Sequence, residues 1–335
     1  METTSKPKKR SWGNRVAIFG VSHGIWMIFI VLFLIGASAV PGFIRLENLR
    51  NVLWGNISFG FLVLGMFIVL LTGAFDLSIE STFAMAPIIA VLFMVEWAPQ
   101  IVSPYVAMLI TIIIGIAIGL FNGLLSVQLG INPFLVTLTV LLSLRGFAEY
   151  LIPEGIYYLP KKFIFIGSGN VLGIPAAIIL FLVAVIIVYF ILRKTVFGKN
   201  LYATGSTESA AYLSGINTKR IRIATFIIAG LFAAIGGIVE TGRMHAVVAA
   251  MGEGEVMTVF AACFLAGTSM SGGRGEVIDL IGAILTLSII TNIMNLVGFN
   301  PFLIKTLYGL ILLVAIIFSN MQQRFRNYLL MRTVS

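Results

Sequence analysis

Long apolar runs separated by short polar breaks make up most of this chain, and they restrict its fold more than any other feature. A helix needs about 20 largely apolar residues to cross the roughly 30 Å of bilayer hydrocarbon. The 335 residues are 59% hydrophobic and 10% charged, whereas soluble domains have about 45–50% apolar and 25% charged residues. The bilayer must therefore be the solvent, and we predict an all-α, polytopic helical membrane protein.

We predict about ten transmembrane helices, of which two, at 82–96 and 255–270, are short enough to be broken or partial. The ten candidate spans are 16–40, 52–72, 82–96, 104–129, 131–151, 173–193, 221–243, 255–270, 276–298 and 301–319. The first run could instead belong to a cleaved signal peptide, because small residues stand at 37–39. Its length of about 25 residues exceeds the roughly 7–15 of a signal-peptide core, so we favour a retained helix.

Basic residues gather in three polar segments: before the first run, between residues 193 and 222, and after residue 323. These segments hold fourteen of the 22 Lys and Arg residues. The positive-inside bias places them in the cytoplasm, and an even number of spans puts both termini there. We predict cytoplasmic tails at 1–15 and 320–335 and a single transmembrane domain at 16–319 with a cytoplasmic loop at 194–220. The basic residues do not form a face interleaved with aromatic residues, so we expect no nucleic-acid partner. Membrane lipid is the expected surrounding.

A six-residue sequence occurs twice, as GINPFL at 130–135 and as GFNPFL at 298–303. Each copy opens a span, the fifth and the tenth, and by parity the two copies have opposite orientations. Inverted repeats are common in transporters, so we predict two inverted repeat halves. The Asn-Pro pair is also good helix-start chemistry, which is the alternative explanation.

Gly115, Gly119 and Gly123 recur every four residues in the fourth span. They leave one face of the helix without side-chain bulk. Such faces let two helix backbones approach closely in lipid, so we predict tight packing against another helix.

The polar segment DLSIES, at 76–81, separates the second and third spans. It is either a cytoplasmic turn, in which Ser78 or Ser81 caps the third helix, or a bend within a broken helix. From the residues alone we favour the cap.

The segment GTSMSGGRGE, at 267–276, contains four glycines and three hydroxyl groups between apolar runs. It cannot form a regular lipid-facing helix, and irregular backbone at membrane depth needs protein or a water-filled cavity around it. We predict a structural break at Gly267, Ser269, Gly272 and Gly273. The segment lacks the residue order of a phosphate-binding loop, so this chain cannot hydrolyse ATP by itself.

The cytoplasmic loop contains a candidate short helix. Ser206 or Thr207 can cap its start, and Gly215 can end it. A short amphipathic helix exposed to the cytosol is suited to docking in a groove of another protein. A solvated helix without a partner is the alternative.

Four motifs occur in order between about residues 60 and 315. They are Asp76-Leu77-Ser78; NPFLVTL from Asn132 with Arg145-Gly146; Phe197-Gly198-Lys199 with Ala210-Ala211 and SGIN from Ser214; and Gly267-Thr268-Ser269 with GGRG from Gly272. Together they resemble the permease family of ribose-type ABC sugar importers. That family usually has a small residue where Glu80 stands, which indicates a divergent member or one half of a heterodimer.

The resemblance implies a non-enzymatic permease subunit in a bacterial inner membrane. Its implied partners are a second permease subunit, in a homodimer or heterodimer, a twin-cassette ATPase and a periplasmic sugar-binding protein. ATP and Mg²⁺ would be held by the ATPase, and no cofactor is expected in this chain. The family's coupling helix, which rests on the ATPase, corresponds to Glu208, Ala210, Ala211 and Gly215.

We expect ATP-driven alternating access to open a path between two such subunits for a monosaccharide or related polyol. A neutral solute suits a lining of hydroxyl, amide and aromatic groups, and our candidates are Asp76, Ser78, Asn132, Phe134, Thr137, Thr139 and Asn295. The alternative is a stand-alone ion-coupled secondary transporter. It would need acidic or His relays in mid-span, but the carboxylates stand near span ends. A non-transporting scaffold would need neither the glycine-rich break nor the coupling segment.

Arg145 and Glu149 have the spacing to pair on one face of the fifth span. An interfacial position explains them equally well, as it does Lys305. His23 and His245 lack companions at metal-ligand spacing, so we expect no metal site. No nucleophile–base pair or pair of carboxylates indicates an enzyme.

Overall fold

The computed structural model describes residues 24–304, 306–314 and 316–317, and this part of the chain is mostly helical. The helices are α2 (Gly24–Ala39), α3 (Leu46–Gly55), α4 (Ile57–Leu70), α5 (Ile79–Leu92), α6 (Pro104–Gly123), α7 (Pro133–Leu151), α8 (Lys161–Ser168), α9 (Ala176–Lys194), α10 (Val196–Ser206), α11 (Glu208–Leu213), α12 (Thr218–Met244), α13 (Glu255–Leu265), α14 (Val277–Val297) and a last helix, Pro301–Val314. Two π-helical turns, η1 (Phe93–Trp97) and η2 (Leu124–Gln128), extend α5 and α6.

Short strands form two antiparallel pairs in the connecting segments. β1 (Ile156–Tyr157) pairs with β4 (Ala246–Val247), and β2 (Asn170–Val171) pairs with β3 (Ile174–Pro175). With two residues each, these strands tie loops together and form no sheet layer of their own.

Six helices are long and apolar enough to cross a membrane: α5 with η1, α6 with η2, α7, α9, α12 and α14. The pair α3 and α4, bent by 40°, makes a seventh if it counts as one span. Three further apolar helices, α2, α13 and the last helix, have only 10–17 residues each. The all-α prediction is therefore confirmed. The predicted count of about ten spans is not confirmed, because the described residues contain six helices of sufficient length, or seven with the bent pair.

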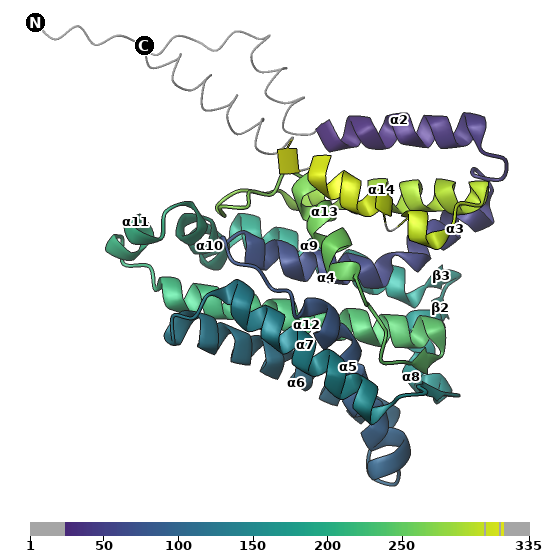
Figure 1. Ribbon diagram of the computed structural model, residues 1–335, viewed down its shortest axis with the longest axis horizontal. Helices are drawn as coiled ribbons and strands as arrows, with labels where there is room; N and C mark the ends of the chain where they lie inside the picture. The colour runs from purple at the N-terminus through teal and green to yellow at the C-terminus, as the bar shows by residue number, and fades with distance from the viewer. Residues whose placement is uncertain (1–23, 305, 315, 318–335) are drawn as a thin grey trace, which may run out of the picture.

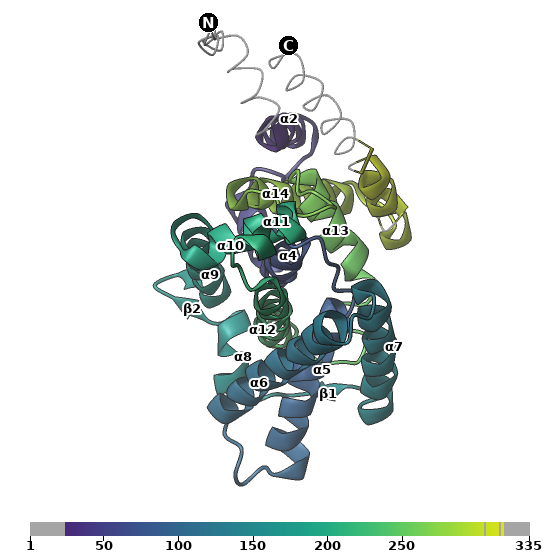
Figure 2. The same ribbon diagram turned by 90° about the vertical axis from the view of Figure 1, so that its left-hand side faces the viewer.

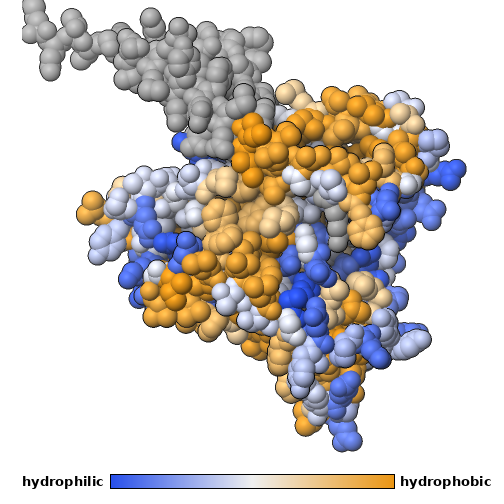
Figure 3. All heavy atoms as spheres, viewed as in Figure 1, coloured by the Kyte–Doolittle hydropathy of each residue, from blue (hydrophilic) through white to orange (hydrophobic). Residues whose placement is uncertain are grey.

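The spanning helices lie roughly side by side between two ends of the molecule, as the two perpendicular views show (Figures 1 and 2). α10 and α11 lie at the left in Figure 1, and we call this the foot end. α8, β2 and β3 lie at the right, which we call the opposite end. Hydrophilic residues gather at both ends, while hydrophobic residues cover much of the surface between them (Figure 3). This distribution is the one that a bilayer requires.

α12 is the central helix and packs against α4, α5, α6 and α8. The most apolar window of α12 is 61% buried, whereas that of α7 is only 17% buried. The exposed residues of α7 include Leu135 and Leu142. Such apolar side chains suit a surface against lipid or another subunit.

The glycine face of α6 packs directly on α12, as the spacing of the glycines predicts. A Cβ atom at Gly119 would lie 2.2 Å from the carbonyl oxygen of Phe226, and one at Gly115 would lie 2.4 Å from that of Gly230. The two backbones are therefore in contact, with no room for a methyl group between them. This close approach positions α12, and with it the foot end, against α6.

We expect Gly119→Ala to destabilise the protein, because the new methyl group overlaps the backbone of α12. Overpacking of this kind costs about 1–3 kcal/mol. Gly146→Ala is a matched control, because Gly146 also lies within a helix but has open space around it. Thermal unfolding in detergent should show a lower Tm for Gly119→Ala only. Equal Tm values for the two variants would contradict this packing.

Candidate functional site

α10 and α11 fill the predicted cytoplasmic loop and form the foot end. The Oγ1 atom of Thr195 accepts a hydrogen bond from the Gly198 amide at 3.2 Å and so caps α10. α11 matches the predicted short helix, and Gly215 follows it with φ = 83°, a conformation that favours glycine. Thr207 stands at the start of α11, but its side chain makes no capping hydrogen bond.

α11 is held by one ion pair and one buried residue, and the rest of the helix is exposed. Glu208 forms an ion pair of 3.1 Å with Arg222 on α12. Ala211 is buried, whereas Tyr212 is 69% and Leu213 is 85% exposed. The other predicted coupling residues are also exposed: Glu208, Ala210 and Gly215. A short helix that offers exposed apolar side chains at a polar end has the form of a docking element.

The end of α10, the segment after α4 and the glycine-rich break before α14 are in backbone contact. We call this contact the glycine junction (Leu71, Gly73, Gly205, Gly272 and Gly273). A Cβ atom at Gly205 would lie 1.8 Å from the Leu71 carbonyl oxygen, and one at Gly272 would lie 2.6 Å from the Gly73 amide nitrogen. The Gly273 amide donates to the Leu71 carbonyl at 2.8 Å. The end of α10 thus touches both the segment after α4 and the glycine-rich break before α14.

The glycine-rich break connects α13 to α14 without helical structure, as the sequence predicts. Gly267, Gly272 and Gly273 have φ values of 77°, 82° and 70°, which only glycine adopts without strain. The Ser269 amide donates to the carbonyl of Arg274 at 3.1 Å, which closes the turn.

Side chains from α9 and α10 hold this break in place. The Tyr202 hydroxyl donates to the Gly275 carbonyl at 2.8 Å, and Arg193 forms an ion pair with Glu276. Burial, with the nearby negative charge of Glu276, raises the pKa of Tyr202 to about 12. The hydroxyl therefore keeps the proton that it donates at neutral pH.

The segment before α5 is a buried break and no exposed turn, so the favoured cap interpretation is wrong. Ser78 stands at the start of α5, but its side chain makes no capping bond. Instead, one carboxylate oxygen of Asp76 accepts from the Ser78 amide at 3.0 Å and from its hydroxyl at 2.6 Å. Asn122 on α6 donates to the same hydroxyl at 2.7 Å. Asp76 is 2% exposed and Ser78 is 0% exposed, so the bend of a broken helix is the better description.

α5 and α13 both begin in the interior of the bundle. A Cβ atom at Gly65 would lie 3.0 Å from Ile79 and 3.2 Å from Ala229, which places the start of α5 beside the middle of α12. From there α5 runs toward the opposite end, because Phe83 packs near Gly237. α13 runs the other way, since the glycine-rich break at the foot end follows it. The two helices therefore start together and point in opposite directions (Figure 1).

Glu80 joins the starts of these two helices. Its Oε2 atom accepts from the Val256 amide, in the first turn of α13, at 2.9 Å. Its Oε1 atom lies 3.7 Å from Nη2 of Arg145. Arg145 also donates to the carbonyls of Ala249 and Met251 in the loop before α13. A carboxylate is favourable at a helix N-terminus, so Glu80 stabilises the start of α13 directly. Through Arg145 it also holds the loop before α13.

Of the two alternatives left open for Arg145 and Glu149, this arrangement excludes their mutual pair. Arg145 points toward Glu80, whereas Glu149 is exposed and takes part in no ion pair within the described residues. Side-chain spacing along α7 permits the local pair, but the buried carboxylate of Glu80 together with two carbonyls offers the guanidinium more partners.

Comparison with known proteins gives the family. A family model described as "Branched-chain amino acid transport system / permease component" matches residues 48–318. The chain is a member of this permease family. No solved structure matches it significantly.

Curated relatives of the permease cover nearly its whole length. The L-arabinose transport system permease protein AraH of Escherichia coli K12 is 35% identical over 91% of this chain and 92% of its own. The ribose import permease protein RbsC of Bacillus subtilis 168 is 33% identical over 91% of this chain and 95% of its own. The ribose import permease protein RbsC of Escherichia coli K12 is 29% identical over 88% of this chain and 92% of its own.

The permease brings together some of the predicted path residues and separates others. Asp76, Ser78 and Thr137 are buried near the start of α5, where the Thr137 hydroxyl lies 3.5 Å from the Phe75 carbonyl. The other four are exposed. Asn132 caps α7, Phe134 and Thr139 lie on α7, and Asn295 lies on α14.

Asn132 and Asn300, the equivalent residues of the six-residue repeat, have the same local role. Each side-chain oxygen accepts from the amide two residues later at 2.9 Å, and so each caps the helix that follows. Helix-start chemistry thus accounts for this pair. His23 and Lys305 lie outside the described residues, and no group of three metal-ligating side chains occurs in the described part of the chain.

Sequence reasoning missed Tyr202, Asn122 and the partnership of Glu80 with Arg145. The one available signal was Glu80 itself, a carboxylate close to the predicted third span. A charge inside a helical bundle needs a partner, and Arg145, on the fifth predicted span, was one candidate for it.

We expect Glu80→Gln to destabilise the permease, because it leaves the guanidinium of Arg145 buried without its countercharge. Removing one partner of a buried pair costs about 3–5 kcal/mol, and the two carbonyl bonds of Arg145 place the loss near the lower value. Glu149→Gln, on an exposed carboxylate, is the control. Thermal unfolding in detergent should show a loss of Tm for Glu80→Gln that Arg145→Met partly restores in the double variant. Additive losses in the double variant would disprove the pairing.

Proposed function

We propose that the permease is the membrane subunit of an ATP-driven importer for a monosaccharide or related polyol. The arabinose and ribose transport named for its relatives supports this substrate class. The family and the match of nearly full length favour this function over a stand-alone ion-coupled transporter.

The proposed partners are a second permease subunit, a twin-cassette ATPase that holds ATP and Mg²⁺, and a periplasmic sugar-binding protein. The second subunit can be identical or different. The poorly buried face of α7 is a surface that such a subunit could cover, and an apolar groove of about 710 Å³ between α6 and α7 runs along it. Lipid would cover the remaining apolar surface.

The foot is the proposed coupling site, with Glu208, Ala210, Ala211 and Gly215 at the ATPase. The observation that carries the proposal is the glycine junction. Because α10 touches both breaks through backbone atoms, a displacement of the foot must move the segment before α5 or the segment after α13. A packed contact without side chains has little compliance. This is the mechanical link that alternating access requires.

The proposed topology has ten membrane segments in one transmembrane domain, 16–319, with both tails in the cytoplasm of a bacterial inner membrane. α2, α13 and the last helix then mark the three segments beyond the seven longer ones. The opposed helices α5 and α13, which start together in the interior of the bundle, support two inverted halves, since interrupted helices meet at the substrate level in inverted-repeat transporters. The proposed path passes Asp76, Ser78 and Thr137 and continues along the exposed Asn132, Phe134, Thr139 and Asn295.

We expect Leu213→Glu to release the ATPase, because it places a charge in the apolar docking surface of α11. An apolar anchor in an interface core is worth about 1.4 kcal/mol or more, which is about tenfold in affinity. Leu213→Met is the control, since it keeps the surface apolar. Co-purification of the ATPase and ATP-dependent uptake by the reconstituted complex measure the effect. The proposal fails if the Leu213→Glu variant still co-purifies with the ATPase and still supports ATP-dependent uptake. It also fails if the purified chain accumulates sugar in vesicles without nucleotide and without a partner.

A further inference from the structure

A polar cavity of about 310 Å³ lies toward the opposite end of the permease, away from the foot. Its walls come from the start of α4, the end of α12, the start of α13, the later part of α14 and the last helix. Polar side chains at its wall include Ser58, Glu240, Arg243, Thr258, Thr291 and Tyr308. None of the seven path residues predicted from the sequence lines it.

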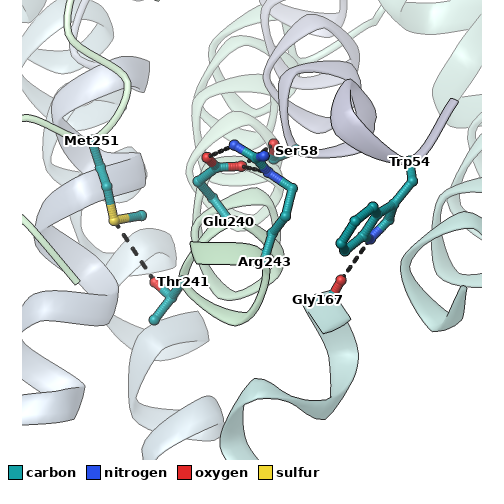
Figure 4. A network of polar contacts seen from close by, with 7 residues as sticks. All are labelled: Trp54, Ser58, Gly167, Glu240, Thr241, Arg243 and Met251. Atoms are coloured by element: carbon teal, nitrogen blue, oxygen red, sulfur yellow. Dashed lines mark hydrogen bonds and ion pairs between the residues drawn. The ribbon is translucent and has the colours of Figure 1, made fainter. Parts of the chain in front are cut away.

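Glu240 and Arg243 form a charged wall of this cavity, and Figure 4 shows them facing one another beside Ser58. Arg243 Nε donates to Glu240 Oε2 at 3.0 Å, and the Ser58 hydroxyl donates to the same oxygen at 2.6 Å. The side chains are 12% exposed for Glu240 and 35% for Arg243. Both residues belong to α12, so their ion pair does not join two helices. Ionisable groups in a span usually mark a water-filled path, which fits their position here.

The rest of the lining suits a sugar. The hydroxyl groups of Thr291 and Tyr308 contact each other at the wall, and Phe59 and Phe83 add aromatic surface. Hydroxyl groups of a polyol can donate to a carboxylate and accept from a guanidinium, while its C–H faces pack on aromatic rings. Ligand pockets have volumes of about 300–1,000 Å³, so this cavity suits a single sugar ring.

The charge of the lining discriminates against anions. Glu253, just before α13, also lines the cavity, so that the described lining holds a carboxylate beyond the pair of Glu240 with Arg243. A phosphorylated sugar of the same size would meet repulsion that a neutral sugar avoids.

We propose that this cavity binds one neutral monosaccharide during transport, an inference that rests on the proposed function. α13 links the cavity to the foot: residues 252–255 line the cavity at its start, and the glycine-rich break that joins the junction follows its end. Gly252 also packs against Phe83 and the Glu80 carbonyl, so the clamp of Glu80 on α13 sets one wall. Movement of the foot then reshapes the cavity through α13.

Cysteine labelling tests this site directly, because the one native cysteine, Cys263, is 0% exposed. Thr291→Cys places a thiol at the cavity wall, and Thr258→Cys places a second one on α13. Ser38→Cys, exposed at the end of α2, is the control outside the cavity. Each variant is reconstituted with its ATPase and binding protein and treated with a small hydrophilic thiol reagent, with D-ribose, L-arabinose or D-ribose 5-phosphate.

At a sugar concentration about ten times Kd, the transported neutral sugar should slow labelling of the Thr291→Cys or the Thr258→Cys variant about tenfold, since only about one site in eleven stays free. Ribose 5-phosphate should leave these rates unchanged, and no sugar should affect labelling of the Ser38→Cys variant. The binding site is overturned if the transported sugar slows labelling of neither cavity variant, or if neither variant is labelled at all. Uptake of sugar by the same complex would still uphold the proposed function. Absence of ATP-dependent uptake of any monosaccharide by the wild-type complex rejects the proposed function instead.

Discussion

The structure depends on one constraint, which is that every backbone polar group away from water must find a partner inside the protein. Helices meet this requirement by themselves, but the breaks before α5, before α13 and before α14 do not. Each break is satisfied by other parts of the chain. Asn122 serves the first, together with Asp76 from within the break, Glu80 and Arg145 serve the second, and the Leu71 carbonyl with Tyr202 serves the third. Irregular backbone is therefore tied to irregular backbone, and the breaks cannot move independently.

Glycine makes this arrangement compact. On α6 the absence of side chains brings two long helices into backbone contact, which supports α12 as a rigid centre. At the glycine junction the same absence lets the end of α10 reach two breaks at once. The contact between α6 and α12 stabilises the bundle. The contacts at the glycine junction couple movement of α10 to movement of the two breaks. Both follow from the fact that van der Waals packing, rather than the hydrophobic effect, holds helices together in lipid.

Two ion pairs inside the bundle differ in position and exposure. Glu80 meets Arg145 across two helices, while Glu240 meets Arg243 within one helix at a cavity wall. The first pair is buried and fixes the start of α13, whereas the second is partly open. α13 lies between them and ends at the glycine-rich break. A short helix with a charged clamp at its start and a glycine-rich break after its end is suited to move as one unit.

The sequence alone determined the all-α membrane class, the glycine packing face, the short foot helix and the non-helical glycine-rich break. These features depend on hydrophobic length and on the regular 3.6-residue spacing of helices, which local sequence fixes. Only the tertiary structure decided that Asp76 lies in a buried break, that Arg145 pairs with Glu80 instead of Glu149, and that the start of α13 shares a cavity with Glu240 and Arg243. These outcomes depend on where irregular segments bring distant residues together, and helical periodicity carries no information about such positions.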